Sequence, residues 1–208
     1  MSNLWPRIEP LLAKVEKPAR YIGMERGAVR PDHRPDEVSW LLVYPDTYEI
    51  GLPNQGLQIL YEILNERDDA SAERAYAPWI DLEASMRATG LPLFSVDTHR
   101  AAGDFDILGF NVLAELVATN VVNLIDLAGL PVRAEHRGPE HPLVIMGGHC
   151  AYNPEPLADF FDAVVLGDGE EAVGEVTAVV GAWKRPAATG ETAPAQGHAR
   201  PCCATSLR

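Results

Sequence analysis

The feature that most constrains the fold of this 208-residue chain is a repeated alternation of apolar strand patterns with amphipathic helix patterns. The predicted strands cover residues 38–44, 73–77, 91–96, 106–112, 143–146 and 163–166, and the predicted helices cover 55–66, 82–89, 115–127 and 170–183. Apolar strands that alternate with helices indicate a parallel sheet covered on both faces. With right-handed crossovers, the simplest arrangement is a doubly wound α/β sheet of the flavodoxin-like or Rossmann-like type, with strand order 2-1-3-4-5.

Two flanking regions differ from this α/β domain, which we place at residues 38–184. Residues 1–37 begin with a helical spacing of apolar residues between Leu4 and Val15 and continue as a charged arm rich in Pro and Gly. Residues 185–208 contain one large aliphatic residue, Leu207, and cannot bury enough apolar surface to offset the entropy of ordering. We therefore predict a disordered, aberrant tail and expect that the chain is truncated after its last helix.

Composition limits the partners and the compartment. Asp and Glu outnumber Lys and Arg by 30 to 17, and the net charge of −13 disfavours binding of nucleic acid by this chain alone. No apolar run approaches the roughly 18 residues of a membrane span, and the first residues do not form a secretory signal. The three cysteines, Cys150, Cys202 and Cys203, suit neither a disulfide framework nor a four-thiolate metal site. We expect a cytoplasmic protein.

Glycine-bearing loops follow three of the predicted strands. Ligands of open parallel sheets bind beyond the carboxyl ends of the strands, where glycines allow close approach of the backbone. We therefore expect the three loops to meet in a shallow ligand-binding crevice. The candidate contact residues in these loops are Asp46, Tyr48, Gly51, Gly147, Gly148, Gly167, Gly169 and Glu170. Each loop alone is also explained as a turn, and Glu170 alone is also explained as a complement to the helix dipole.

Motifs for independent catalysis are absent. The sequence has no Gly-x-Ser-x-Gly elbow, no Walker loop and no His-Glu-x-x-His, and we nominate no catalytic residue. The tripeptide Asp97-Thr98-His99 is interpreted as a surface turn because an isolated Asp-x-His is a weak motif. His149 lies beside Gly148 at the expected crevice and is a candidate for contact with a ligand there. A lone His is, however, more often structural than part of a metal site, because metal ligands normally occur in sets of three or four.

Longer phrases carry a family resemblance over about two-thirds of the chain. They are YPDTYEIGLPNQGLQILYEILNER, AERAYAPWIDLEASMR, FDILGFNVLAELVATNVVNLIDLAGLP and GGHCAYNPEPLADFFDAVVLGDGEE. This region resembles the cobalamin-binding-like domain found in front of radical S-adenosylmethionine (radical SAM) enzymes, and most closely a subgroup of uncharacterised fused radical SAM proteins. The resemblance implies a catalytic radical SAM barrel as partner, with cobalamin as a possible cofactor of this domain.

The resemblance also shows where the chain departs from the cobalamin pattern. Such domains are similar in carrying Asp-x-His-x-x-Gly, Ser-x-Leu and Gly-Gly after the first, third and fourth strands. Here the first motif reads Asp46-x-Tyr48-x-x-Gly51, the second reads Asn111-x-Leu113, and Gly147-Gly148 is intact. The resemblance therefore adds Asn111 and Leu113 to the eight candidate contact residues named above. A phenol is a poor cobalt ligand at neutral pH, unlike an imidazole. Two alternatives follow: cobalamin binds without a protein ligand on cobalt, or the domain binds no cobalamin.

The Cys-x-x-x-Cys-x-x-Cys motif that holds the four-iron cluster of radical SAM enzymes is also absent. The 4Fe-4S cluster and S-adenosylmethionine are therefore expected only in the barrel, and this chain is not expected to be catalytic alone. Our leading hypothesis is an accessory domain that binds a cofactor or shapes the substrate site. The alternative, favoured by the two altered motifs, is a ligand-free structural or interaction domain.

Overall fold

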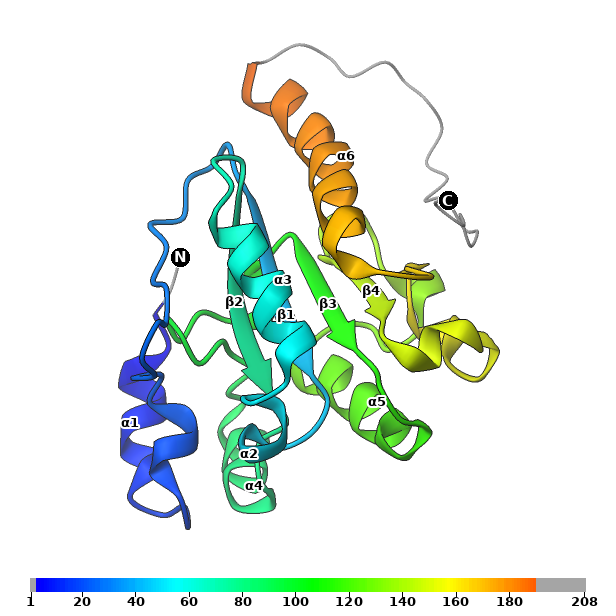
Figure 1. Cartoon of the computed structure of the whole chain (residues 1–208). Helices are drawn as coiled ribbons and strands as arrows, with labels where there is room; N and C mark the ends of the chain where they lie inside the picture. Colours follow the sequence, from blue (N-terminus) through cyan, green and yellow to red (C-terminus); the bar gives the residue numbers. More distant parts are fainter. Residues whose placement is uncertain (1–2, 190–208) are drawn as a thin grey trace.

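The computed structural model describes residues 3–189 and contains a five-stranded, all-parallel sheet. Its strand order is β2-β1-β3-β4-β5, so the predicted doubly wound α/β fold and the order 2-1-3-4-5 are confirmed (Figure 1). The strands are β1 Val38–Tyr44, β2 Ala70–Tyr76, β3 Ile107–Asn111, β4 Leu143–Gly147 and β5 Ala163–Val164.

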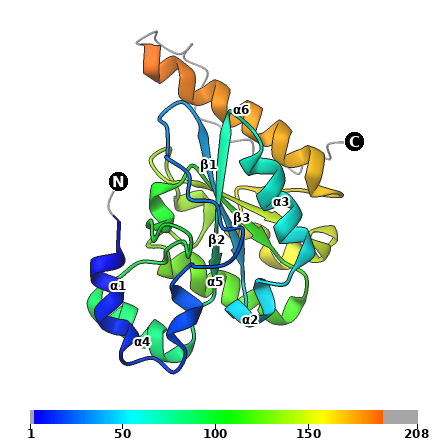
Figure 2. The ribbon, with the colours of Figure 1, turned by 60° about the vertical axis from the view of Figure 1, so that its left-hand side comes forward.

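Helices cover both faces of the sheet. The α-helices are α1 Trp5–Leu12, α2 Tyr48–Gly51, α3 Gln55–Asn65, α4 Ile80–Thr89, α5 Ala118–Leu127 and α6 Gly169–Thr189. The 3₁₀ helices are η1 Pro18–Tyr21, η2 Ala102–Asp104, η3 Glu115–Val117, η4 Ala134–His136, η5 His149–Tyr152 and η6 Glu155–Phe160. Helices α3 and α6 lie on one face, and α1, α4 and α5 lie on the other (Figures 1 and 2).

The alternation of side chains along β1 explains why the sheet has two apolar cores. Trp40 and Leu42 pack toward α3 and α6, whereas Leu41 and Val43 pack toward α1, α4 and α5. All four side chains are buried, and burial of a large apolar side chain stabilises a fold by about 1.5–3 kcal/mol. A continuous apolar run is therefore the pattern that a central strand of this sheet requires.

Several element boundaries differ from the predictions. Strand β2 begins at Ala70 rather than residue 73, and its polar Ser71 is buried there by a hydrogen bond to Glu37 from a distant segment. The predicted strand 91–96 does not form, and Phe94 makes an isolated bridge to Ala101. The predicted helix 115–127 opens as the separate turn η3 before α5 begins.

The last helix also differs from its prediction. Helix α6 continues to Thr189, five residues into the segment 185–208 that was predicted to be disordered. The rest of that segment lies outside the described residues. Trp183, which we placed on the buried stripe of this helix, is 56% exposed. The stripe ends earlier because α6 packs its apolar face through Val173 and Val180.

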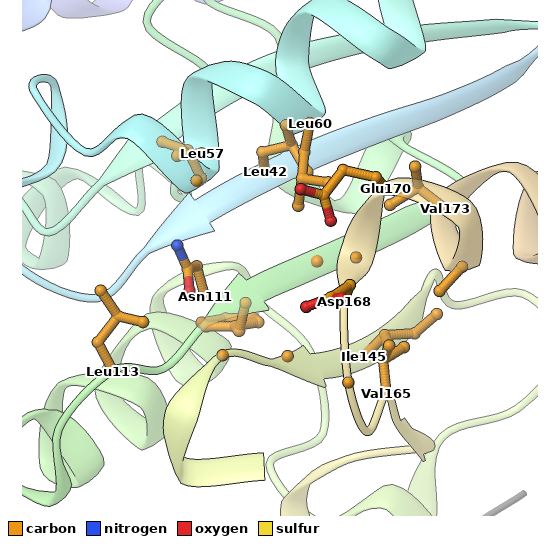
Figure 3. A pocket seen from close by; sticks show the side chains of 18 of the residues that line it. Leu42, Leu57, Leu60, Asn111, Leu113, Ile145, Val165, Asp168, Glu170 and Val173 are labelled. Carbon is orange, nitrogen blue, oxygen red and sulfur yellow. The ribbon is translucent and has the colours of Figure 1, made fainter. Parts of the chain in front are cut away.

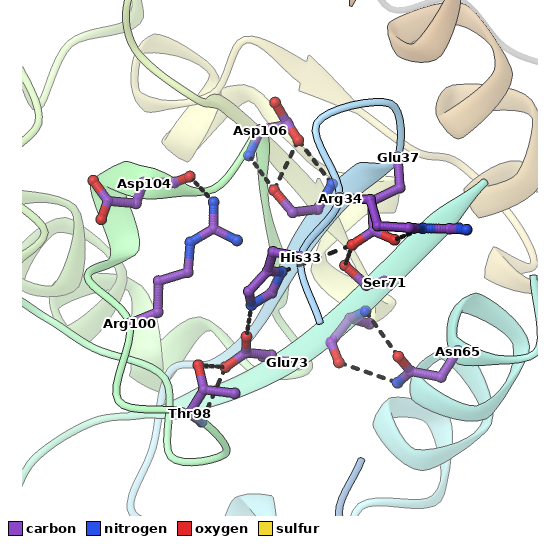
Figure 4. Close-up of polar contacts among 12 residues, drawn as sticks. His33, Arg34, Glu37, Asn65, Ser71, Glu73, Thr98, Arg100, Asp104 and Asp106 are labelled. Carbon is purple, nitrogen blue, oxygen red and sulfur yellow. Dashed lines mark hydrogen bonds and ion pairs between the residues drawn. The ribbon is translucent and has the colours of Figure 1, made fainter. Parts of the chain in front are cut away.

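The outer edge of β2 is closed by side chains. Asn65 bonds both the backbone N–H and the carbonyl of Ala72, at 3.1 and 3.0 Å (Figure 4). Asp97 accepts from the backbone N–H of Arg74 at 2.7 Å, and the carbonyl of Arg74 accepts from Val96. Paired edge groups prevent this strand from templating association with another chain.

The segment before β1, predicted as an extended arm, packs over β2 through buried polar contacts. His33 Nε2 lies 2.5 Å from Glu73 Oε1, and the ring lies between Glu73 and Glu37 (Figure 4). Thr98 donates its hydroxyl to Glu73 Oε2 at 2.7 Å, and Ser71 donates to Glu37 at 2.8 Å. These bonds compensate two carboxylates that burial would otherwise destabilise.

Candidate functional site

A groove of about 390 Å³ opens between α3 and α6, beyond the carboxyl ends of the central strands (Figure 3). We call it the α3/α6 groove. Its apolar walls come from Trp40 and Leu42 of β1, Leu57 and Leu60 of α3, Ile145, Val165, Ala172, Val173 and Val176. The volume lies within the range of about 300–1,000 Å³ that is typical of small-molecule pockets.

Seven of the ten predicted site residues line this groove. They are Asn111, Leu113, Gly147, Gly148, Gly167, Gly169 and Glu170. Two of the three predicted glycine loops therefore meet as expected, together with the end of β3. The loop after β1 does not join them, because Asp46, Tyr48 and Gly51 do not line the groove.

The two glycines that end β4 have different structural roles. Gly147 shares a sheet face with Ile145, and a Cβ atom added to Gly147 meets no atom within 4 Å. Gly148 has φ of +94°, and an added Cβ would lie 2.7 Å from Asn111 Oδ1 and from the carbonyl oxygen of Val112. Gly148 is therefore required by the turn, whereas Gly147 leaves open space in the groove.

Two asparagine amides form the polar end of the groove. Asn54 caps α3, because its Oδ1 accepts from the backbone N–H of Leu57 at 2.9 Å. The same oxygen accepts from Asn111 Nδ2 at 3.1 Å, so the predicted residue Asn111 is held in place by the cap. Asn54 precedes the predicted helix 55–66 and was not among the candidate site residues. Its second role depends on a contact between residues 57 positions apart.

The loop after β1 fastens the N-terminal segment instead of facing the groove. The hydroxyl of Tyr48 donates to Glu25 Oε1 at 2.7 Å, and its ring meets that of Tyr76 edge-on at 5.4 Å. Burial raises the pKa of Tyr48 above its ordinary value, and Glu25 raises it further. Gly51 is required here because an added Cβ would lie 2.4 Å from the Tyr76 ring.

The neighbours of Tyr48 also make structural contacts, and those of Glu49 reach the N-terminal segment. Glu49 pairs with Arg20 at 2.9 Å and with Lys17 at 3.3 Å. Asp46 Oδ1 accepts from the backbone N–H of Thr47, and its carbonyl accepts from Ala77. The tyrosine that replaces the expected histidine is thus part of an attachment between α2 and the segment before β1.

The Asp-x-His tripeptide is not a surface turn, as we had interpreted it, but is buried. Asp97 is 1% exposed and binds Arg74 at 2.7 Å, and His99 is 8% exposed. His99 Nε2 lies 2.9 Å from the carbonyl oxygen of Tyr21, and burial lowers the pKa of His99. Both residues have structural partners, and neither lines the groove.

The described residues do not fit an iron–sulfur cluster or another resident metal. Within residues 3–189, no group of three or more His, Cys, Asp or Glu side chains is arranged to hold a metal ion. Cys150 is a free, half-buried thiol. Burial is the main cause that raises the pKa of this thiol, and the negative charge of Glu115 raises it further. Cys202 and Cys203 lie outside the described residues. Across the same described range, no helix is long and apolar enough to cross a membrane.

A parallel, doubly wound sheet with a groove at its carboxyl edge defines an α/β domain of the Rossmann-like class. A family model described as "Radical SAM proteins, N-terminal" matches residues 56–196, and the chain belongs to this family. The match reaches past residue 185, where we predicted an aberrant tail. Neither a curated protein nor a solved structure matches the chain.

Proposed function

We propose that this chain is a ligand-binding accessory domain of a radical SAM enzyme, which binds a cofactor or shapes the substrate site. The α3/α6 groove supports this proposal best. It lies where ligands bind in open parallel sheets, and Gly147 leaves space in it that no described side chain fills. The catalytic barrel, with its 4Fe-4S cluster and S-adenosylmethionine, is the proposed partner.

Cobalamin is the proposed cofactor. In this proposal the loop after β1 supplies no ligand to cobalt. The hydroxyl of Tyr48 is committed to Glu25, and its raised pKa keeps the phenol protonated. The groove accommodates only part of so large a molecule, so the corrin ring would remain outside it. Bound cobalamin would supply radical chemistry, whereas the residues of this chain would hold and orient it.

The test is a titration of the purified chain with cobalamin, followed by absorbance and calorimetry. The Gly147→Val variant places a side chain in the open part of the groove, and we expect it to weaken binding at least about tenfold. Gly103→Val is the matched control, because Gly103 lies outside the groove and an added Cβ approaches no atom closer than 3.8 Å. Undetectable binding by the folded chain, or equal effects of the two variants, contradicts the cofactor role.

The alternative is a ligand-free interaction domain, and one surface favours it. Exposed apolar side chains occur on the loops after β1, β3 and β4: Ile50 is 53% exposed, Leu116 92% and Tyr152 71%. Exposed apolar side chains that gather at one edge are typical of a protein interface. Leu116→Asp should abolish association with a separately expressed radical SAM barrel if this alternative holds. Undiminished association removes the support that this surface gives.

A further inference from the structure

The α3/α6 groove combines apolar walls with an acidic mouth. Asp168 and Glu170 line it, and no Lys or Arg occurs among the described residues that do so. His149 also lines the groove. If the groove binds a ligand, as proposed above, this distribution of charge restricts the chemistry of that ligand.

Both carboxylates point into the groove. Asp168 reaches in from the loop before α6, and Glu170 reaches in from the first turn of that helix (Figure 3). Both residues are exposed, and neither carboxylate makes a hydrogen bond or an ion pair with any described residue. Their charges are therefore not compensated by a neighbouring cation within the described part of the chain.

The helix dipole of α6 does not reverse this charge. The N-terminus of a helix is equivalent to about half a positive charge, which alone would favour an anion. Here Asp168, Glu170 and Glu171 place three carboxylates at that terminus. The mouth of the groove is therefore net negative and disfavours an anionic group of a ligand, so the phosphate of the proposed cobalamin would not lie there.

We propose that the groove selects an organic cation, with the apolar part of the ligand in the slot and its positive group beside Asp168 and Glu170. The electrostatic interaction between two unit charges about 4 Å apart in bulk water changes a binding affinity by about fivefold. Two carboxylates that attract a cation and repel an anion therefore separate matched ligands by at least about tenfold. The effect is screened by salt because both side chains are exposed.

Three ligands that share the same ring system but differ in charge test this selection. Tryptamine, tryptophol and indole-3-acetate are cationic, neutral and anionic, and each carries the same indole. We expect calorimetry at low ionic strength to show tryptamine binding at least about tenfold more tightly than indole-3-acetate, with tryptophol between them. Gly147→Val should weaken the binding of all three, which assigns the binding to the groove.

Removal of the two charges should remove most of the preference. In the double variant Asp168→Asn/Glu170→Gln, the ratio of the affinities for tryptamine and indole-3-acetate should fall below about threefold. The control Glu62→Gln/Glu175→Gln removes the same charge from α3 and α6 outside the groove and should leave the ratio unchanged.

Three results overturn the inference. They are no measurable binding of tryptamine at millimolar concentration, equal or tighter binding of indole-3-acetate, and a ratio that the Asp168/Glu170 double variant leaves unchanged. The cobalamin titration is read separately. If the chain binds cobalamin but does not prefer tryptamine over indole-3-acetate, only the inferred selection of cations is overturned. If it prefers tryptamine but does not bind cobalamin, only the proposed cofactor is overturned.

Discussion

Tyr48→Phe tests whether the loop after β1 is a structural attachment. The change removes one hydroxyl, which donates at 2.7 Å to the carboxylate of Glu25, and leaves the edge-on ring contact with Tyr76 in place. Glu25 is mostly buried, and its second oxygen, Oε2, has no hydrogen-bond partner among the described residues. A hydrogen bond to a charged group contributes about 1.5–3 kcal/mol, and we expect the free energy of unfolding to fall by that amount.

The assay is equilibrium unfolding in urea, with Tyr44→Phe as the matched control. Tyr44 is also a half-buried tyrosine at the end of β1, but its hydroxyl makes no hydrogen bond within the described structure. We expect the control to change the free energy of unfolding by less than about 0.5 kcal/mol. Equal losses in the two variants would refute the attachment of the N-terminal segment through Tyr48.

Three further perturbations follow from buried groups and from the turn after β4. Asp97→Ala should lower the free energy of unfolding by about 3–5 kcal/mol in urea denaturation, because it leaves the buried guanidinium of Arg74 without its closest partner. Burial alone would raise the pKa of Glu73, but the hydrogen bond with His33 and other hydrogen bonds bring it below its ordinary value. The ionised Glu73 therefore stabilises the fold fully above the unfolded-state pKa of about 4.3, and this stabilisation is lost as the pH falls through the lower folded-state pKa. The Glu73→Gln variant should flatten this acidic part of a plot of unfolding free energy against pH. Gly148→Ala should lower the free energy of unfolding by about 1–3 kcal/mol, measured by thermal or urea denaturation, because it forces alanine into a backbone with φ of +94°.

The sheet was predictable from the sequence because its central strands are continuous apolar runs. Strand β1 was predicted with its observed bounds, since both of its faces are covered by helices. The start of β2 was missed because the polar Ser71 reads as a surface residue. Its burial depends on Glu37, which lies 34 positions earlier in the chain.

The candidate site was predictable where backbone conformation determines it. Glycines after β4 and before α6 mark turns that bring the chain to the carboxyl edge, and both turns line the groove. The loop after β1 starts at the same edge, but the contact of Tyr48 with Glu25 directs it elsewhere. Sequence spacing gives no signal for that contact. Sequence spacing also gives no signal that Asn54 lines the groove, because the hydrogen bond of Asn54 with Asn111 joins residues that are distant in the chain.

Hydrogen exchange with and without saturating cobalamin tests most directly whether the groove holds a ligand. Our account predicts slower amide exchange at residues 147–152 and 167–173, which form one side of the groove, with unchanged exchange in α1 and α4. Unchanged exchange throughout the chain, or protection confined to residues 46–51, would contradict the assignment of the α3/α6 groove as the cofactor site.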